Sequence, residues 1–367
     1  MSRGETYRFL CGCLSKRLSD PQREMFHQLA QKGALDWTTF IVMASESLVA
    51  QLVLAAARTN GLADLLPADV VDYLDGMTIL NRQRNRRIQS DINEVAAVFA
   101  RIGVAPVLLK GAAHLMSGLY DDIGGRVMLD IDLLVPHESL QNCADALKQE
   151  GFRILADNGF PAHHHYPPLG RSGDIASIEL HVEALDAPHS RLLPSDEIFA
   201  TSAPLRDDSR LALPSFQSRL ILAVAHAQLS NHAYLYGELG LRDLIDFAQL
   251  CHRHAHEIDW EHLTQRFKHW NAQTALCWQL LAGLELVGIP FPPEIRINLV
   301  ARLLHAVAMW EIDHPRLASM RTRLLRPVLQ LRRSMSGPPL RRRLLQNVRD
   351  PAWLSRHLRL LAGRWSS

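Results

Sequence analysis

The sequence has 367 residues, of which 47% are hydrophobic and 21% are charged, with a formal net charge of +2. This composition is that of a globular protein and excludes a chain that is disordered throughout. The length exceeds one ordinary domain and predicts two or three.

The N-terminal twenty residues contain no unbroken apolar segment of the kind found in signal peptides. The most apolar stretch, residues 41–57, contains Glu46 and Gln51 and falls short of a membrane span. The sequence therefore predicts a cytoplasmic protein with no membrane span. Five scattered cysteines form neither a disulfide framework nor a zinc spacing and are interpreted as buried or incidental thiols: Cys11, Cys13, Cys143, Cys251 and Cys277.

Charge is distributed unevenly along the chain. Residues 296–367 contain fifteen arginines, no lysine and three acidic residues, which leaves the rest of the chain acidic on balance. Such a segment is either a solvated helical face or a contact for a phosphate-bearing partner or an anionic surface.

In chain order, the first hundred residues have helical spacing, with helices predicted over residues 41–57 and 81–102. The middle third alternates short strands with helices. Strands are expected at residues 106–109, 128–135, 152–156 and 175–183, and helices at 112–119 and 137–150. Beyond residue 214 helical patterns return, at residues 216–229, 239–252, 261–267 and 274–287.

Two carboxylates, Asp130 and Asp132, lie two apart on the strand Met-Leu-Asp-Ile-Asp-Leu-Leu-Val and therefore project from the same face. Like charges this close repel each other, and a divalent cation such as magnesium removes the repulsion because it prefers oxygen ligands. Taken alone, the pair is better interpreted as solvated carboxylates at the end of a strand.

A second acidic strand, Glu-Leu-His-Val-Glu, strengthens the metal interpretation. Glu179, His181 and Glu183 share one face of it, and Glu179 can complete a three-carboxylate cluster if the two strands are neighbours. His181 can bind the metal or orient a carboxylate. The run from His163 to His165 precedes this strand and is interpreted as a loop at the rim of the site.

Lys110 and Gly111 stand where a predicted strand turns into a helix. Backbone N–H groups at such a turn attract phosphate, and the lysine adds a positive charge. Arg126, four residues before Asp130, can clamp a phosphate, pair with the acids or lie on the surface.

The segments Leu-Leu-Lys-Gly-Ala-Ala-His-Leu, Arg-x-Met-x-Asp-Ile-Asp-Leu-Leu-Val and Ile-Glu-Leu-His-Val-Glu, in this order, resemble the nucleotidyltransferase superfamily related to DNA polymerase beta. Within it, the sequence is similar to the bacterial family of uncharacterised nucleotidyltransferases. The run Leu-Arg-Asp-Leu-Ile-Asp at residues 241–246 matches a helical segment of that family. The resemblance covers roughly residues 81–250.

The resemblance implies an α+β fold: a mixed β-sheet core with helices, flanked by N-terminal and C-terminal helical regions. The expected limits are a helical region at 1–80, the nucleotidyltransferase core at 81–190, a helical domain at 191–295 and an Arg-rich helical tail at 296–367.

The resemblance also implies a reaction, the transfer of a nucleoside monophosphate from a nucleoside triphosphate to an acceptor hydroxyl. Magnesium, with two ions expected, is held by three carboxylates, and the third is a ligand or the base that activates the acceptor. The implied metal ligands and catalytic residues are Asp130, Asp132 and Glu179. The implied nucleotide-binding residues are Lys110, Gly111, Ala112, Arg126, Arg242 and Asp246.

One position departs from the superfamily pattern. Where that pattern has Gly-Ser or Gly-Gly, this chain has Gly111-Ala112 and lacks the serine hydroxyl. The alternative is therefore a weak or inactive nucleotidyltransferase fold that binds nucleotide or a partner. The acceptor stays open between RNA, a protein or peptide, and a small molecule, and the Arg-rich tail favours RNA.

Overall fold

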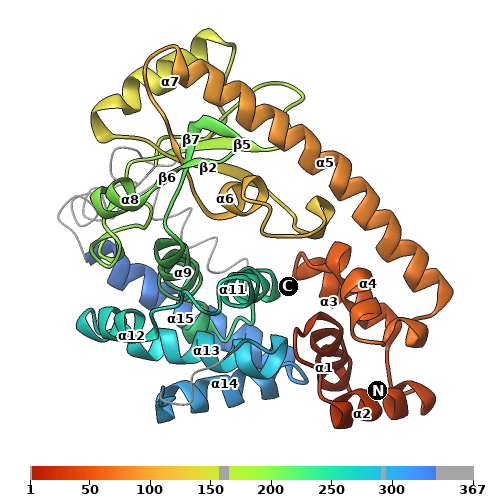
Figure 1. The fold of residues 1–367 in the computed structure, drawn as a ribbon. Helices are drawn as coiled ribbons and strands as arrows, with labels where there is room; N and C mark the ends of the chain where they lie inside the picture. Colours follow the sequence, from red (N-terminus) through yellow and green to blue (C-terminus); the bar gives the residue numbers. More distant parts are fainter. Residues whose placement is uncertain (1, 157–164, 291–294, 336–367) are drawn as a thin grey trace, which may run out of the picture. The chain divides into compact units, whose positions relative to one another are not determined.

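The structure is a computed structural model that describes residues 2–156, 165–290 and 295–335, with side chains up to residue 329 (Figure 1). It divides into two compact units, Met1–Ala318 and Ser319–Ser367. The first unit contains the whole sheet and is described below. Residues 336–367 of the Arg-rich tail lie outside the described residues, as do His163 and His164.

Four short helices begin the chain. Ser19 and Gln22 form a capping box at the start of the second helix, and Asp36 accepts a hydrogen bond from the Thr39 N–H at the start of the third. The helices are α1 (Arg3–Leu14), α2 (Asp20–Gln31), α3 (Trp37–Glu46) and α4 (Ala50–Thr59).

The single helix predicted over residues 41–57 is wrong, because the chain bends by 115° between α3 and α4. Leu48 has a φ of 57°, and the N–H groups of Leu48 and Val49 close the end of α3 on the carbonyls of Ser45 and Ala44. Over the described residues, no single helix is both long and apolar enough to cross a membrane. The pair α3 and α4 meets those criteria only when both are counted across the bend.

Helix α5 (Ala68–Ala100) is 33 residues long and runs past the sheet (Figure 1). The prediction of a helix over 81–102 is confirmed, but the helix begins thirteen residues earlier, directly after Pro67. It is therefore continuous across residue 80, where a boundary was expected.

Seven short strands form one mixed sheet in the order β3-β4-β5-β2-β1-β7-β6. Neighbours β2 and β5 are parallel, as are β1 and β7, whereas the other pairs are antiparallel. The strands are β1 (Val107–Leu108), β2 (Asp130–Leu134), β3 (Arg153–Ile154), β4 (Leu169–Gly170), β5 (Ser177–His181), β6 (Ala203–Leu205) and β7 (Asp208–Leu213). The α+β class with a mixed sheet is thus confirmed.

The sequence missed three of these strands. Strand β4 has two residues in a segment rich in Pro and Gly, too short for any alternation to show. Strands β6 and β7 form a hairpin around a charged turn, and only two of their nine residues are buried. The sheet consequently extends to Leu213, beyond the expected limit of the core at residue 190.

The remaining helices cover the sheet or follow it. Helix α9 continues directly into a π-helical turn, η5, so the helix predicted over 216–229 has a change of geometry inside it. The helices are α6 (Lys110–Met116), α7 (Leu140–Gln149), α8 (Ser195–Thr201), α9 (Phe216–Val224), η5 (Ala225–Ser230), α10 (Ala233–Tyr236), α11 (Leu241–Arg253), α12 (Trp260–His269), α13 (Gln273–Val287), α14 (Leu299–Glu311) and α15 (Pro315–Met335). Single turns lie at η1 (Ala63–Leu65), η2 (Ile123–Gly125), η3 (His137–Ser139) and η4 (His189–Arg191).

The two faces of the sheet have different surroundings. Ile131 and Leu133 of β2, with Ile178 and Leu180 of β5, belong to an apolar core shared with α5, α6 and α7. Because side chains alternate along a strand, the intervening residues of β2 and β5 project from the opposite face.

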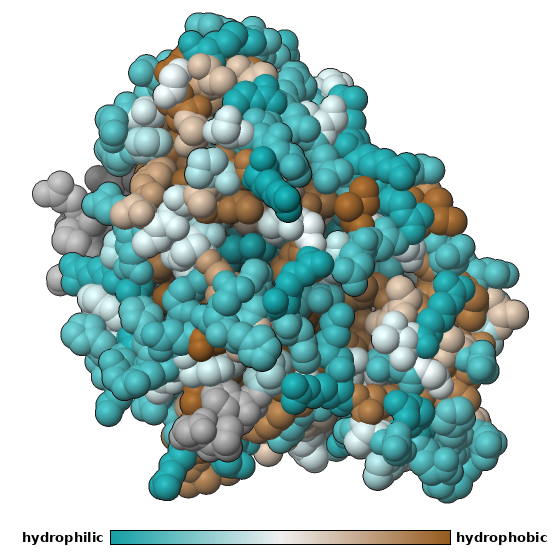
Figure 2. Space-filling model, in the orientation of Figure 1, coloured by the Kyte–Doolittle hydropathy of each residue, from teal (hydrophilic) through white to brown (hydrophobic). Residues whose placement is uncertain are grey.

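The face of the molecule seen in Figure 2 is mainly hydrophilic, with apolar residues in scattered spots.

Candidate active site

The parallel pairing of β2 with β5 brings the predicted acidic residues together. In this register Asp132 lies directly beside Glu179. Donor atoms of Asp132, Glu179 and His181 all lie within 4.8 Å of one another, a grouping that can hold a metal ion. Asp132 is 1% exposed and His181 is fully buried, whereas the side chain of Glu179 is 18% exposed.

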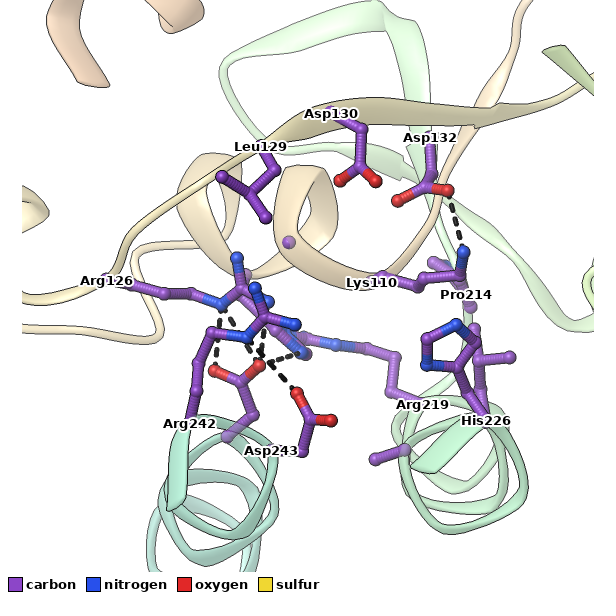
Figure 3. A pocket seen from close by; sticks show the side chains of 15 residues that line it. Lys110, Arg126, Leu129, Asp130, Asp132, Pro214, Arg219, His226, Arg242 and Asp243 are labelled. Carbon is purple, nitrogen blue, oxygen red and sulfur yellow. Dashed lines mark hydrogen bonds and ion pairs between the residues drawn. The ribbon is translucent and has the colours of Figure 1, made fainter. Parts of the chain in front are cut away.

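Asp130 projects from the same face of β2 as Asp132 (Figure 3). It is only partly buried and lies outside the group of three with the closest donor atoms. Burial and the neighbouring charge of Asp132 raise the pKa of Asp130. This proximity of like charges is the condition that a divalent cation would relieve.

Lys110 lies at the start of α6 with a φ of 44° and sends its side chain to β2. Its Nζ lies 2.8 Å from Asp132 Oδ1 (Figure 3). Burial lowers the pKa of Lys110, but the attraction of Asp132 outweighs it and the pKa is raised. The lysine, predicted to contact phosphate, is in this structure the counter-ion of Asp132.

His181 hydrogen-bonds the same carboxylate, with its Nε2 2.7 Å from Asp132 Oδ1 and 3.6 Å from Glu179 Oε2. Burial raises the pKa of Asp132, yet Lys110 and the hydrogen bond from His181 reverse that effect and keep this carboxyl well below its usual pKa. Of the two roles predicted for His181, this geometry corresponds to orienting a carboxylate.

Of the other residues predicted around the second acidic strand, one lies beside Glu179 and one does not. His165, from the predicted histidine-rich loop, is buried, with its Nε2 3.5 Å from Glu179 Oε2. Glu183, predicted to share the face of Glu179, instead accepts a hydrogen bond from Ser195 Oγ at 2.9 Å. Strand β5 ends at His181, so the alternation of side chains does not extend to Glu183.

A pocket opens beside Asp130 and Asp132, between the sheet and helices α6, α9 and α11 (Figure 3). The space inside it, with open solvent at its mouth, is about 780 Å³. Its lining includes the predicted residues Lys110, Gly111, Arg126, Asp130, Asp132, Arg242 and Asp246.

Arg126 and Asp246 form a buried ion pair at the edge of the pocket. Arg126 Nε and Nη2 donate to the Asp246 carboxylate at 2.9 and 2.8 Å, and Tyr120 Oη donates to it at 2.5 Å. Burial raises the pKa of Asp246, but Arg126 outweighs that effect and brings the pKa to about 2. Arg126 is only 9% exposed, so the surface interpretation of this residue is wrong, and its acidic partner lies 120 positions away.

Gly111 and Ala112 lie at the predicted turn. A side chain on Gly111 would collide with Arg126 and with Met128, which gives the glycine a packing role in addition to its place in the pocket lining. The methyl group of Ala112 is fully buried in the apolar core that the sheet shares with α5, α6 and α7.

Several residues of the pocket had no role in the site predicted from the sequence. His114 and His226 line it, and burial lowers the pKa of each imidazole to about 3, so both are neutral near pH 7. Arg219 of α9 also lines it and is 8% exposed. The predicted helix over 216–229 contained two of them, but helical spacing alone does not show which arginine or histidine faces a site.

The donor set fits a divalent cation. Carboxylate oxygens of Asp132 and Glu179, with that of Asp130 on the same face, are hard ligands suited to magnesium. Asp132 is at present compensated by Lys110 at 2.8 Å and hydrogen-bonded by His181 at 2.7 Å, and both partners lie at the same oxygen, Oδ1.

Comparison with known proteins gives one family. Its model, described as "Uncharacterised nucleotidyltransferase", matches residues 33–285. That range contains the whole sheet, the acidic cluster and the pocket. No curated protein and no solved structure matches the chain.

Proposed function

Because the chain belongs to the family of uncharacterised nucleotidyltransferases, we propose that it transfers a nucleoside monophosphate from a nucleoside triphosphate to an acceptor hydroxyl. The observation that carries this proposal is the register of β2 against β5, which brings Glu179 beside Asp132, a residue that lines the pocket together with Asp130. Carboxylates from two neighbouring strands are the ligands that this chemistry needs.

Asp130, Asp132 and Glu179 would hold the cation. A bound magnesium ion supplies Lewis-acid stabilisation of the negative charge that develops on the transferred phosphate. His181 positions the Asp132 carboxylate through its hydrogen bond, and Lys110 adds positive charge at the same oxygen.

The reaction forms one bond and breaks one. The acceptor oxygen bonds to the α-phosphorus, the bond from that phosphorus to the bridging oxygen breaks, and pyrophosphate leaves. Glu179 is the third ligand or the base that takes the hydroxyl proton. Arg242 and Asp246 line the pocket from α11, and we assign Gly111 and Ala112 to the phosphate side through their backbone.

Turnover of α-labelled triphosphates tests the proposal. The full-length protein is incubated with each of the four nucleotides, magnesium and a cell extract, and the labelled product is identified. Asp130→Asn, Asp132→Asn and Glu179→Gln should each reduce labelling at least about 100-fold, because each removes charge that acts in the transition state. Glu183→Gln is the matched control, since Glu183 contacts Ser195 rather than the cluster. Equal labelling by all four variants and the wild type would refute the site.

The alternative is a fold that binds nucleotide without turnover. Ala112 favours it, because this residue brings no hydroxyl to the phosphate turn, and so does the engagement of Lys110 by Asp132. Magnesium-dependent nucleotide binding without pyrophosphate release in any extract would establish it. The acceptor stays open between RNA, a protein or peptide, and a small molecule.

A further inference from the structure

Four basic and four acidic side chains line the pocket, but not all of them are in ion pairs. Within the described part of the chain, three ion pairs account for six of the eight: Lys110 with Asp132, Arg126 with Asp246, and Arg242 with Asp243. The two that remain are Asp130, beside the acidic cluster, and Arg219. No ion pair among the described residues therefore involves Asp130 or Arg219, although Lys110 and Arg242 act on Asp130, and Asp246 acts on Arg219, through their charges.

Arg219 is buried, yet its hydrogen bonds among the described residues go only to neutral groups. Its Nη2 lies 3.1 Å from His114 Nδ1 and donates to Ser117 Oγ at 2.9 Å. Both hydrogen bonds therefore involve the same guanidinium nitrogen. Its Nε is shielded from solvent and has no hydrogen-bond partner among the described residues. Burial lowers the pKa of Arg219 to about 10, which still leaves the side chain charged near pH 7.

The position of this guanidinium points to a ligand. Arg219 extends from α9 toward Arg126 and Arg242, so that three guanidinium groups converge in one part of the pocket (Figure 3). Only two carboxylates, Asp243 and Asp246, accompany them. Burying a charge without a partner is unfavourable, and such an arrangement persists when a bound group of opposite charge completes it.

We propose that Arg219, together with Arg242, forms a subsite for a phosphate group of the substrate. A guanidinium presents its N–H groups in a fork that matches phosphate oxygens. Arg242 contributes because, among the described residues, its ion pair with Asp243 engages only Nε, at 3.2 Å. Arg126 is held bidentately by Asp246 and serves as a neighbour rather than a ligand.

The proposal rests on the proposed function and adds to it the chemistry of one substrate group. Its test is a binding measurement and needs no turnover. A phosphate at Arg219 also leaves the carboxylate end of the pocket to the cation. The same chemistry can come from the nucleotide's own phosphates or from a phosphorylated acceptor, and the experiment distinguishes these sources.

Calorimetric titration of the full-length protein with inorganic tripolyphosphate and pyrophosphate, at fixed ionic strength with magnesium and again with EDTA, provides the test. Arg219→Met should weaken binding about 10- to 100-fold, the effect of losing hydrogen bonds to a charged group. Arg242→Met should weaken binding as well, by a smaller factor. Arg210→Met, which removes one charge from an exposed residue of β7 outside the pocket, should match the wild type.

A second readout separates a ligand role from a packing role. Without phosphate, Arg219→Met should unfold at a higher temperature than the wild type, because it removes an unpaired buried charge. Adding tripolyphosphate should stabilise the wild type and not the variant. If Arg219→Met does not fold, Arg242→Met decides, since that side chain is one-quarter exposed. Wild-type affinity for both probes in the folded variants would overturn the proposal.

A further titration identifies which molecule supplies the phosphate group. The pyrophosphate titration is repeated in the presence of saturating α,β-methylene analogues of the four nucleoside triphosphates. If an analogue abolishes the Arg219-dependent binding, the subsite holds the nucleotide's phosphates. If pyrophosphate still binds, it holds the phosphate of an acceptor. Arg219-dependent binding with no turnover would sink the proposed reaction and leave the subsite standing.

Discussion

At the scale of single residues, Asp246 connects two parts of the fold. Its carboxylate, 5% exposed, accepts hydrogen bonds from Arg126 and Tyr120 and lies 3.9 Å from the imidazole of His114. Those three residues precede the helical region, whereas Asp246 lies in α11. One carboxylate thus fixes the side of the pocket where the sheet region and the later helices meet.

Asp246→Asn should lower the free energy of unfolding at pH 7 by about 3–5 kcal/mol, because it leaves the Arg126 charge buried without a partner. The folded pKa of Asp246, about 2, lies below its ordinary value, so the ionised carboxylate stabilises the fold above about pH 4. That contribution is lost as the pH falls toward 2. Denaturant unfolding between pH 2 and 7 should therefore show the gap between the two proteins narrowing on acidification.

Asp145→Asn, at an exposed position of α7, is the control for Asp246→Asn. It should change the free energy of unfolding by no more than about 0.5 kcal/mol. A gap between wild type and Asp246→Asn that is independent of pH would contradict the assignment.

At the scale of elements, α5 supports the loop that carries Arg126. Asn81 Nδ2 donates to the carbonyls of Gly124 and Arg126, at 2.7 and 2.9 Å. Asn85 Nδ2 donates to the carbonyls of Ile123 and Arg126, at 2.5 and 2.8 Å. Because both amides are buried, these bonds replace water and hold the loop before β2 in one conformation.

Asn85→Ala should reduce the free energy of unfolding by about 1–3 kcal/mol, because the carbonyl of Ile123 loses its side-chain donor in a buried site. It should also weaken tripolyphosphate binding, since Arg126 and the pocket edge lose their support. Chemical unfolding and calorimetry measure the two effects. Gln83→Ala, on the exposed side of the same turn of α5, should change neither, and an Asn85 variant that behaves like it would contradict the role given to α5.

At the scale of the whole molecule, cation binding should be linked to folding. The three carboxylates come from two strands that are adjacent only in the folded sheet, so the unfolded chain offers no comparable site. A ligand that binds only the folded state stabilises it by mass action, by about 2.7 kcal/mol at a concentration of 100 Kd.

Magnesium or manganese should therefore raise the unfolding temperature of the wild type and of Glu183→Gln, and EDTA should reverse the shift. Asp132→Asn should show no shift. Asp130→Asn should unfold at a higher temperature than the wild type in EDTA, because it removes a carboxylate whose pKa is raised by burial and by the charge of Asp132, and it should respond less to the cation. Scanning calorimetry measures all four, and an equal response in Asp132→Asn would exclude this cluster as the cation site.

The sequence by itself determined the strands that carry Asp130, Asp132 and Glu179 and the order of the elements around them. The reason is that periodicity and the placement of carboxylates in an apolar strand are local features, readable without contacts. It also determined the family resemblance, which the match over residues 33–285 confirms.

Only the tertiary structure decided which side chains meet. The parallel register of β2 and β5 joined Asp132 to Glu179 and His181 and left Glu183 with Ser195. The partners of Arg126, Lys110 and Arg219 depend on packing across 120, 22 and 105 positions. Such pairings are set by how helices cover the sheet, which no local pattern encodes, and for this reason Arg219 emerges as a ligand candidate only in the folded pocket.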